Sequence, residues 1–419
     1  MDILILHGLG PKKNWIKSWE ETELFIPKTD SVNNYIIHNC IYDVPNCLKK
    51  YRFDAIIMMS TFMDWVKREP LTGPWLLKYD FVKRSDAMKI VYSQDDYWLS
   101  EIRDEFCVKF NIDLLLPFCD PESWKELYPN YINRGGKIRQ GYTCYLTENM
   151  KKLTKRRIPW EQRKIDIVYR ASGVPTFPNK FGYIKAQIGN RFLSSLGPET
   201  SLVTDISTSQ SKFLTGDSWY SFMSNSKAIL GSNTGSSVQI RNFDVVKKIE
   251  EVRKSFPKID NYDLEVESIP LVDRNKEFDG ISPRNVEAAL LGVVQILVKG
   301  RYGGLLKPGI HYLELDEDCG NANEIALFLK DEKRCREIVN NCYQAFINFK
   351  EMSAEFEVDE ILNSIKKHPK DKKQQDKNSF KKLEKVYNRQ KSYLTFKYQC
   401  KRLYDYFRRK VLYYHLGKK

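Results

Sequence analysis

Short apolar runs, separated by polar segments long enough for a helix, recur through the first third of the chain. The runs lie at residues 2–6, 35–38, 55–59, 89–92 and 113–117. Each is apolar on both faces, as expected for parallel strands that helices cover on both sides of a sheet. Helix-compatible segments follow at 96–110 and 121–128. The pattern predicts one doubly wound, Rossmann-like α/β unit over residues 1–150.

The alternation restarts after a basic segment at residues 148–164. Helix-compatible stretches include 324–346, which has the pattern of one long amphipathic helix, and 243–278 is interpreted as a charged loop that carries a helix at 245–255. We expect a second Rossmann-like unit over residues 151–365, and two facing units create a cleft for a ligand. The predicted strands of this unit are 165–169, 201–205, 228–231 and 293–298. The remaining predicted helices are 180–192, 219–226 and 286–291.

The last part of the chain, residues 366–419, has a different pattern. Residues 366–377 predict a solvated linker, and from residue 379 apolar residues return at helical spacing among Lys and Arg. This spacing predicts one or two basic amphipathic helices. The apolar positions are Leu383, Val386, Tyr387, Leu394, Leu403, Tyr404, Phe407, Val411, Leu412 and Tyr414.

Composition shows where the charge of this 419-residue chain lies. Hydrophobic residues make up 42% and aromatic residues 13%, enough for a large core, and the formal charge is +14 from 68 Lys and Arg against 54 Asp and Glu. Residues 366–419 hold 19 basic and 4 acidic residues, which leaves 49 and 50 for residues 1–365. The nearly neutral body argues against a protein that binds nucleic acid over its whole surface.

Cysteine usage and hydropathy indicate the compartment. The nine cysteines include no C-x-x-C pair, which favours free thiols in a reducing compartment over a disulfide framework or a zinc site. The N-terminus lacks the features of a signal peptide, and no segment reaches the roughly 20 apolar residues of a membrane span. We therefore expect a cytoplasmic protein.

The segment at residues 281–315 carries the most specific chemical signal. It has a loop with Ser282, a helix that begins near Arg284, a buried strand and a glycine-rich turn. A helix N-terminus beside an arginine is an anion site, and Glu287 one turn further is placed to accept hydrogen bonds from a sugar diol. A capped helix with a surface carboxylate is the alternative interpretation.

This segment resembles the nucleotide-sugar site of glycosyltransferases with two facing Rossmann-like domains, the GT-B fold. More narrowly, it is similar to the bacterial "glycosyl transferases group 1" proteins of surface-polysaccharide clusters. The shared features are Ser282-Pro283-Arg284, Glu287-Ala288, Gly303-Gly304, Pro308-Gly309 and His311-Tyr312. Residues 166–175, 181–192, 228–244 and 90–98 extend the resemblance, so that it covers roughly residues 85–345.

The resemblance implies which residues bind the donor. Arg170 and Lys185 match basic residues near the donor diphosphate, together with Ser282 and Arg284, while Glu287 would hold the ribose. Gly303 and Gly304 match the glycine-rich turn. The retaining branch of this fold has two glutamates eight positions apart, but Asp279 stands in the first position. Retention or inversion at the anomeric carbon therefore stays open.

The resemblance also implies a metal-independent reaction without a cofactor, since the nucleotide-sugar is itself a substrate. Residues 316–318 formally fit a D-x-D metal motif, but their place after a strand favours a solvated acidic turn. A base for the acceptor hydroxyl is sought in the first unit, where His7 follows the first strand and Asp95 and Asp96 follow a later one. An ordinary turn at His7 and a helix N-cap at the aspartates are the alternatives.

Together these observations predict a glycosyltransferase of the hexosyl type that moves a sugar from a nucleotide-sugar to a glycan or lipid-linked acceptor in surface-polysaccharide synthesis. The basic tail, residues 379–419, is expected to dock on an anionic membrane surface, which would make the protein peripheral on the inner face of the membrane. One alternative is that the tail is a solvated helix or a coiled-coil arm, and another is a non-catalytic two-domain protein that binds nucleic acid through this tail.

Overall fold

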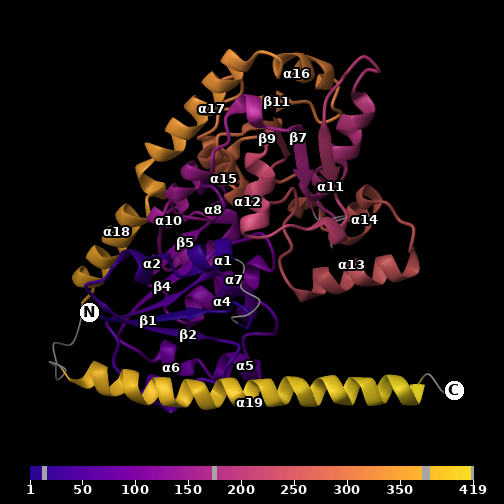
Figure 1. The fold of residues 1–419 in the computed structure, drawn as a ribbon. Coiled ribbons are helices and arrows are strands. Elements are labelled where there is room, and N and C mark those ends of the chain that lie inside the picture. The colour runs from indigo at the N-terminus through magenta and orange to yellow at the C-terminus, as the bar shows by residue number, and fades with distance from the viewer. Residues whose placement is uncertain (12–16, 172–176, 370–377, 417–419) are drawn as a thin grey trace.

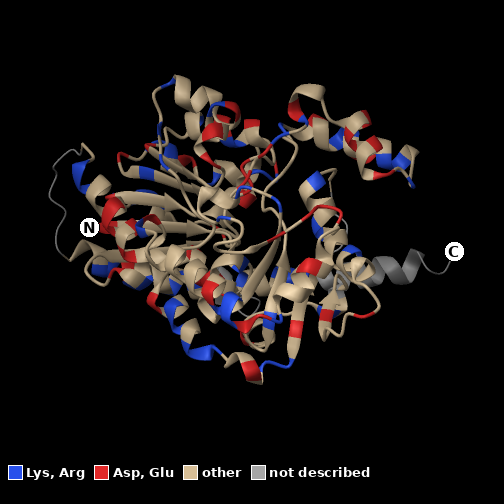
Figure 2. Cartoon of the chain, turned by 90° about the horizontal axis from the view of Figure 1, so that it is seen from above, with Lys and Arg blue, Asp and Glu red and all other residues tan. Residues whose placement is uncertain are grey.

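The computed structural model describes residues 1–11, 17–171, 177–369 and 378–416 (Figure 1). Parts of the predicted linker, residues 370–377, and of the upstream resemblance, residues 172–175, lie outside the described residues. Two parallel sheets dominate the fold, and acidic and basic positions are interspersed along the described part of the chain (Figure 2).

The first sheet has six parallel strands in the order β2-β1-β3-β4-β5-β6. The strands are β1 (Asp2–His7), β2 (Asn34–Asn39), β3 (Ala55–Met58), β4 (Met88–Ser93), β5 (Leu114–Pro117) and β6 (Lys137–Ile138). The helices of this half are α1 (Lys17–Glu23), α2 (Phe25–Thr29), α3 (Asn46–Lys50), α4 (Ser60–Val66), α5 (Pro74–Leu77), α6 (Asp80–Lys83), α7 (Ser100–Lys109), α8 (Trp124–Leu127), α9 (Pro129–Asn133) and α10 (Glu148–Lys151).

The second sheet has five parallel strands in the order β11-β10-β9-β7-β8. The strands are β7 (Ile165–Arg170), β8 (Thr204–Ser207), β9 (Ser226–Gly231), β10 (Val294–Val298) and β11 (Leu313–Leu315). The remaining helices are α11 (Lys180–Ser195), α12 (Asp217–Ser224), α13 (Phe243–Ser255), α14 (Asn261–Ser268), α15 (Pro283–Leu291), α16 (Ala322–Phe328), α17 (Glu332–Ile347), α18 (Ala354–Lys367) and α19 (Ser379–Leu416).

The predicted α/β fold of two Rossmann-like sheets with a helical tail is confirmed, with local corrections. The strand expected at 201–205 begins three residues later, at Thr204. The single helix expected at 324–346 is two helices, because Asp331 accepts a hydrogen bond from the amide of Arg334 at 3.1 Å and starts α17. The edge strands β6 and β11 were not predicted, since two or three residues show no readable alternation.

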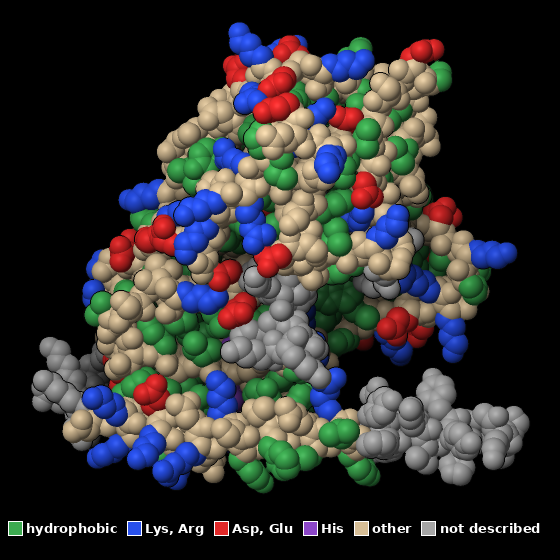
Figure 3. Space-filling model, viewed as in Figure 1, with side chains coloured by type: hydrophobic (Ala, Val, Ile, Leu, Met, Phe, Trp, Pro, Cys, Tyr) green, Lys and Arg blue, Asp and Glu red, His purple; other side chains and the backbone are tan. Residues whose placement is uncertain are grey.

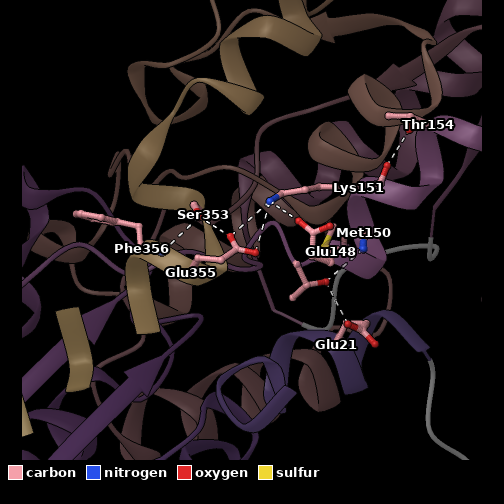
Figure 4. Close-up of polar contacts among 9 residues, drawn as sticks. Glu21, Glu148, Met150, Lys151, Thr154, Ser353, Glu355 and Phe356 are labelled. Atoms are coloured by element: carbon pink, nitrogen blue, oxygen red, sulfur yellow. Dashed lines mark hydrogen bonds and ion pairs between the residues drawn. The ribbon is translucent and has the colours of Figure 1, made fainter. Parts of the chain in front are cut away.

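The chain crosses between the sheets twice, and the two crossings are joined. The amide of Leu146 donates to the carbonyl of Met352 at 2.7 Å, and Leu146 also forms a parallel bridge with Ser353. Figure 4 shows the side chains around this junction, where the Lys151 ammonium contacts both Glu148 and Glu355. The paired crossings fix where the second half begins relative to the first.

Helix α18 follows the second crossing and packs on the first sheet. Val358, Ile361 and Ile365 share a buried cluster with the strand residues Ile3 and Ile57. On the same helix, Glu357 is fully buried and accepts two hydrogen bonds from Arg139, at 2.6 and 2.9 Å, and one from Tyr92 at 2.6 Å. The last helix before the tail therefore closes the first half although it follows the second in sequence.

Helix α19 lies along the first half, beside α3, and corrects one expectation for the tail (Figure 1). Phe380, Leu383 and Tyr387 are buried in the core cluster of the first sheet and so are not part of a free amphipathic surface. The Tyr387 hydroxyl donates to the carbonyl of Ile37 at 2.8 Å and lies 3.3 Å from His38 Nδ1. None of the helices in the described part of the chain combines the length and apolar content that a membrane span requires.

We expect Tyr387→Ala to lower the free energy of unfolding by about 3–5 kcal/mol, because it removes a buried aromatic ring. Tyr387→Phe is expected to cost about 1–3 kcal/mol, since the carbonyl of Ile37 loses a donor. Tyr393→Ala is the matched control, because Tyr393 lies six residues further on the same helix and is 66% exposed. Urea unfolding measures all three variants, and equal losses at positions 387 and 393 would contradict the observed packing.

Candidate active site

A cleft of about 460 Å³ lies between the two halves, at the carboxyl ends of the strands of both sheets. From the first half it is lined by Thr22, Glu23, Ser60, Thr61, Asp64, Gln94, Asp95 and Thr143. From the second half it is lined by Arg170, Ala171, Lys185, Phe213, Leu214, Thr215, Gly216, Trp219, Pro283, Arg284 and Glu287. Figure 1 shows α12 and α15 above the boundary between the two halves and α1 and α4 below it.

The N-terminus of α15 enters the cleft and is held by its own capping residues. Ser282 is the N-cap, and its backbone N–H and side-chain hydroxyl both donate to the Asn285 side chain, at 3.1 and 2.7 Å. The Asn285 amide group in turn donates to Gln295 on β10 at 2.8 Å. Ser282 is therefore engaged in capping, and it is the next residues, Pro283 and Arg284, that line the cleft.

Arg284 lines the second-half wall of the cleft. Its Nη2 donates to the backbone carbonyl of Arg170 at 2.7 Å, and its guanidinium lies over the rings of Tyr169 and Trp219, at 5.6 and 5.4 Å from the centroids. This bond uses one of the five N–H donors of the guanidinium. Arg284 is thus held in place with donors left for an anion in the cleft.

Lys185 on α11 lines the same wall. Its pKa falls from the usual 10.5 to about 8, mainly because the ammonium is removed from water and secondarily because Arg284 repels it, while Asp95 acts in the opposite direction. Two cations that repel each other in one cleft form a site that an anion would stabilise.

Arg170 lines the cleft, but its guanidinium is committed elsewhere. It donates to the Asp205 carboxylate at 2.7 Å, to the carbonyls of Tyr169, Asp205 and Lys212 at 2.9–3.2 Å, and lies over the ring of Phe222. These contacts use four of the five donors and hold β7 to β8. The geometry therefore gives Arg170 a structural role beside the cleft, and the diphosphate contact expected of it has little donor capacity left.

Glu287 lies one turn into α15, with both carboxylate oxygens in contact. Trp219 Nε1 donates to Oε2 at 2.9 Å, and the Tyr220 hydroxyl lies 3.5 Å from Oε1. Burial raises the pKa of Glu287 from 4.5 to about 7, against the opposing effects of Trp219 and Arg284. The residue lines the cleft beside Arg284 and presents hydrogen-bonding oxygens there.

Glu23, at the end of α1, faces this wall from the first half and was not predicted. Its carboxylate accepts hydrogen bonds from the hydroxyls of Ser60 and Thr61, both at 2.5 Å, and from the Thr61 amide at 3.3 Å. Burial raises its pKa from 4.5 to about 7, although these hydrogen bonds lower it. The sequence gives no motif around Glu23, so only its convergence with Ser60 and Thr61 reveals it.

Of the three residues predicted on the acceptor side, one lines the cleft and two do not. Asp95 lines the cleft and accepts a hydrogen bond from the Tyr97 hydroxyl at 2.8 Å. Asp96 is fully buried and accepts from the amides of Phe118 and Cys119 and from the Tyr128 hydroxyl, which is a structural role.

His7 is also buried and lies outside the lining. Burial, and then the charge of Lys391, lower its pKa from 6.5 to about 3. The adjoining Gly8 packs against α4 so closely that a Cβ would lie 2.3 Å from the Thr61 carbonyl oxygen. The glycine-rich turn therefore serves strand–helix packing.

Asp279, Gly303 and Gly304 form a second group, away from the lining of the cleft. The amide of Gly303 donates to Asp279 at 3.4 Å, and burial raises the pKa of Asp279 from 3.8 to about 6. Gly303 and Gly304 both have positive φ, which explains the glycines as a turn. Their predicted donor contacts have no support from this geometry. Among the described residues, no group of three or more His, Cys, Asp and Glu side chains has the arrangement of a metal site.

Comparison with solved structures identifies the architecture. An α-glucosyltransferase in complex with UDP and a 13-mer DNA containing a HMU base matches with a TM-score of 0.50 and 11% identity, over 88% of this chain and 100% of that chain. HepE from Anabaena in complex with UDP (TM-score 0.45, 12% identity, 87% and 100% covered) and a glycosyltransferase from Rickettsia africae ESF-5 (0.48, 10%, 87% and 97%) also match.

The match to the α-glucosyltransferase, with the two parallel sheets, shows the GT-B fold. At such low identity it shows the fold alone. No family model and no curated protein matches the sequence. The narrower resemblance to the group 1 glycosyltransferases stays a prediction.

The raised pKa of Glu23 predicts a specific pH dependence of stability. Between about pH 4.5 and 7 the folded protein keeps a proton on Glu23 that the unfolded chain has released, so this group destabilises the fold as the pH rises. We expect Glu23→Gln to gain stability relative to wild type between pH 5 and 8, by on the order of 2–3 kcal/mol. Urea unfolding at several pH values measures this difference.

The informative quantity is how the difference in unfolding free energy between Glu23→Gln and wild type changes with pH. Glutamine replaces one hydrogen-bond acceptor by a donor, which shifts this difference by the same amount at every pH. Glu324→Gln, at an exposed carboxylate on α16, is the control and should run parallel to wild type. A Glu23→Gln curve parallel to wild type would show that Glu23 is ionised in the fold.

Proposed function

We propose that the protein is a glycosyltransferase that takes its sugar from a nucleotide-sugar bound in this cleft. One observation carries the proposal: Lys185, Arg284 and Glu287, from segments about a hundred positions apart, line one cleft between the carboxyl ends of two parallel sheets. The α-glucosyltransferase with the same fold was solved with UDP, which supports a nucleoside diphosphate as the ligand.

In this proposal Arg284 and Lys185 bind the diphosphate, and Glu287 accepts hydrogen bonds from the ribose hydroxyls. The bond between the anomeric carbon and the diphosphate oxygen breaks, and the oxygen of the acceptor hydroxyl forms the new bond to that carbon. The leaving diphosphate gains negative charge, which the two cations and the N-terminus of α15 stabilise. The carbonyl of Arg170 holds the Arg284 guanidinium before the donor binds, which reduces the reorganisation that the reaction requires.

Glu23 is our proposed base on the acceptor side. It replaces His7 and Asp96, which do not line the cleft, whereas Glu23 does. With a pKa of about 7 it is partly ionised at neutral pH, and this balance suits a group that takes the proton of the attacking hydroxyl. The hydroxyls of Ser60 and Thr61 hold the carboxylate in position.

From the sequence resemblance alone, we propose hexosyl transfer without a metal to a glycan or lipid-linked acceptor of surface-polysaccharide synthesis. Donor turnover that persists in EDTA would agree with metal independence. Sugar transfer from a nucleotide-sugar and the identity of the acceptor are separate proposals. The first rests on the geometry of the cleft, whereas the second rests on the sequence resemblance.

Arg284→Ala is expected to weaken UDP binding by about 10–100-fold, the loss typical of a hydrogen-bonded ion pair. Arg284→Lys should lose less, because it keeps the charge while losing the fork that bonds the Arg170 carbonyl. Titration calorimetry measures both, with Arg336→Ala on α17 as the control outside the cleft. A wild type that binds none of UDP, GDP, ADP or CDP would refute the proposed function.

Glu23→Gln is expected to slow hydrolysis of the preferred UDP-sugar, in which water replaces the acceptor, by about 10²–10⁴-fold. UDP affinity should stay within about twofold, since Glu23 lies on the opposite wall from Arg284. The acidic limb of the pH–rate profile, expected near pH 7, should disappear. Asp95→Asn, at another carboxylate of the lining and one of the bases that the sequence predicted, is the comparison. If Asp95→Asn removes the limb and Glu23→Gln does not, the base is Asp95.

A further inference from the structure

Helix α19 has two apolar faces, and only one of them is used by the body of the protein. The inner face carries Phe380, Leu383 and Tyr387, which are buried in the first core. It ends in contacts with the β2–α3 loop, where the rings of Tyr398 and Tyr42 lie 5.4 Å apart.

The second face, which we call the outer stripe, consists of Val386, Tyr393, Phe396, Cys400, Leu403 and Tyr404. Five of these side chains are large hydrophobic groups with exposures of 42%, 66%, 64%, 56% and 66%, and Cys400 is also exposed. Figure 3 shows hydrophobic side chains on the side of α19 that faces away from the body.

The spacing of the outer stripe follows the helical repeat. Steps of seven, three, four, three and one residues, at 100° per residue, keep all six positions within a sector of about 100°. Tyr387 and Leu383 point roughly 100–140° away from the centre of this sector by the same geometry. A helix that bound only the body would need the inner face alone, so the outer stripe calls for a second partner.

Charge selects the kind of partner. Residues 379–404, whose side chains the structure describes, hold 8 Lys and Arg and one acidic residue, Glu384. The body, residues 1–365, is nearly balanced, with 49 basic and 50 acidic residues. A second copy of the helix would bring two strongly positive surfaces together, whereas an anionic surface is complementary.

Anchoring of α19 makes the outer stripe a fixed surface. The Tyr387 hydroxyl binds the carbonyl of Ile37, the Lys397 ammonium lies 3.3 Å from Asp43, and the thiol of Cys47 contacts Gln390. Beyond these contacts the helix continues past the body (Figure 1). An ordered stripe loses less conformational entropy on binding than an unstructured tail would.

We propose that the outer stripe of α19 docks on an anionic lipid membrane surface, with Tyr393, Phe396 and Leu403 inserted at the level of the headgroups and the lysines and arginines contacting anionic lipids. Aromatic and aliphatic side chains in one sector of a cationic helix are the arrangement of an interfacial membrane helix. The proposal does not depend on the proposed reaction, because no residue of the stripe lines the cleft.

The test uses the full-length protein in flotation with large vesicles of phosphatidylcholine alone or with 30% phosphatidylglycerol. We expect partition into the anionic vesicles to exceed that into neutral ones by at least about tenfold at low salt. Removing each cation should reduce partition by about fivefold. Phe396→Asp with Leu403→Asp should abolish flotation, and Lys385→Glu with Arg389→Glu, at two exposed cations in the same sector of the helix, should reduce it at least tenfold.

Matched controls separate the stripe from general effects. Leu271→Asp with Val272→Asp changes two exposed apolar residues, 76% and 66% exposed, away from α19. Lys330→Glu with Lys333→Glu changes two exposed lysines near α16 and α17. Both double variants should float like wild type, and circular dichroism should show that all four variants are folded.

Three results would overturn the proposal. The first is equal or no partition into neutral and anionic vesicles, and the second is unchanged flotation of Phe396→Asp with Leu403→Asp. The third is a dimer or a single-stranded RNA complex that the same substitutions abolish while vesicles are ignored, which would assign the stripe to a second copy or to nucleic acid.

Discussion

The cleft depends on one set of hydrogen bonds that holds the N-terminus of α15 against the end of β7. Arg284 donates to the carbonyl of Arg170, while the Asn285 side chain accepts a hydrogen bond from the amide of the N-cap Ser282 and donates to Gln295 on β10. At the other end of α15, Arg157 donates to the carbonyls of Leu290 and Ala289 at 2.9 and 3.2 Å. Both ends of the helix are therefore tied to other elements, which holds Pro283, Arg284 and Glu287 in the lining of the cleft.

Burial then sets the electrostatic balance inside the cleft. The raised pKa values of Glu23 and Glu287 keep both carboxyls partly protonated near neutral pH, while Arg284 stays charged. Ionised carboxylates in the cleft would repel a diphosphate and offset part of the attraction of the cations. Burial reduces that repulsion without removing hydrogen-bonding groups, so the same carboxyls can bind hydroxyls of a ligand.

The strands were predictable because a buried parallel strand has to be apolar on both faces, whatever its neighbours are. The residues at 55–59 and 89–92, for example, have no other stable place than the centre of a sheet. Arg284 and Glu287 were predictable for a related reason, since they belong to one helix turn whose start is marked by Ser282 and Pro283. Local sequence is sufficient where one element determines both the fold and the position of the side chain.

Side chains that depend on several elements could not be located in this way. Arg170 was predicted to contact the donor diphosphate, and it lines the cleft, but Asp205 and Lys212 decide where its guanidinium points. Glu23 lies in a short helix without a motif, and its burial is created by Ser60 and Thr61, about 37 residues away. The pKa of a carboxyl group and the number of free donors on a guanidinium depend on tertiary contacts. The sequence pattern alone does not show these contacts.

Helix α19 shows the same limit on a larger scale, because both of its apolar faces have helical spacing in the sequence. Leu383 and Val386 are three residues apart and read as neighbours on one face, yet Leu383 is 6% exposed and Val386 is 42% exposed. Residues near a boundary between two faces can be assigned only when the body that covers one of them is known. The first sheet and α3 cover the inner face, and the outer stripe stays exposed on a helix that holds 8 Lys and Arg and one acidic residue over residues 379–404. A helix that is bound on one side by its own protein and is apolar and basic on the other therefore has the form of a connector between that protein and a second, anionic surface.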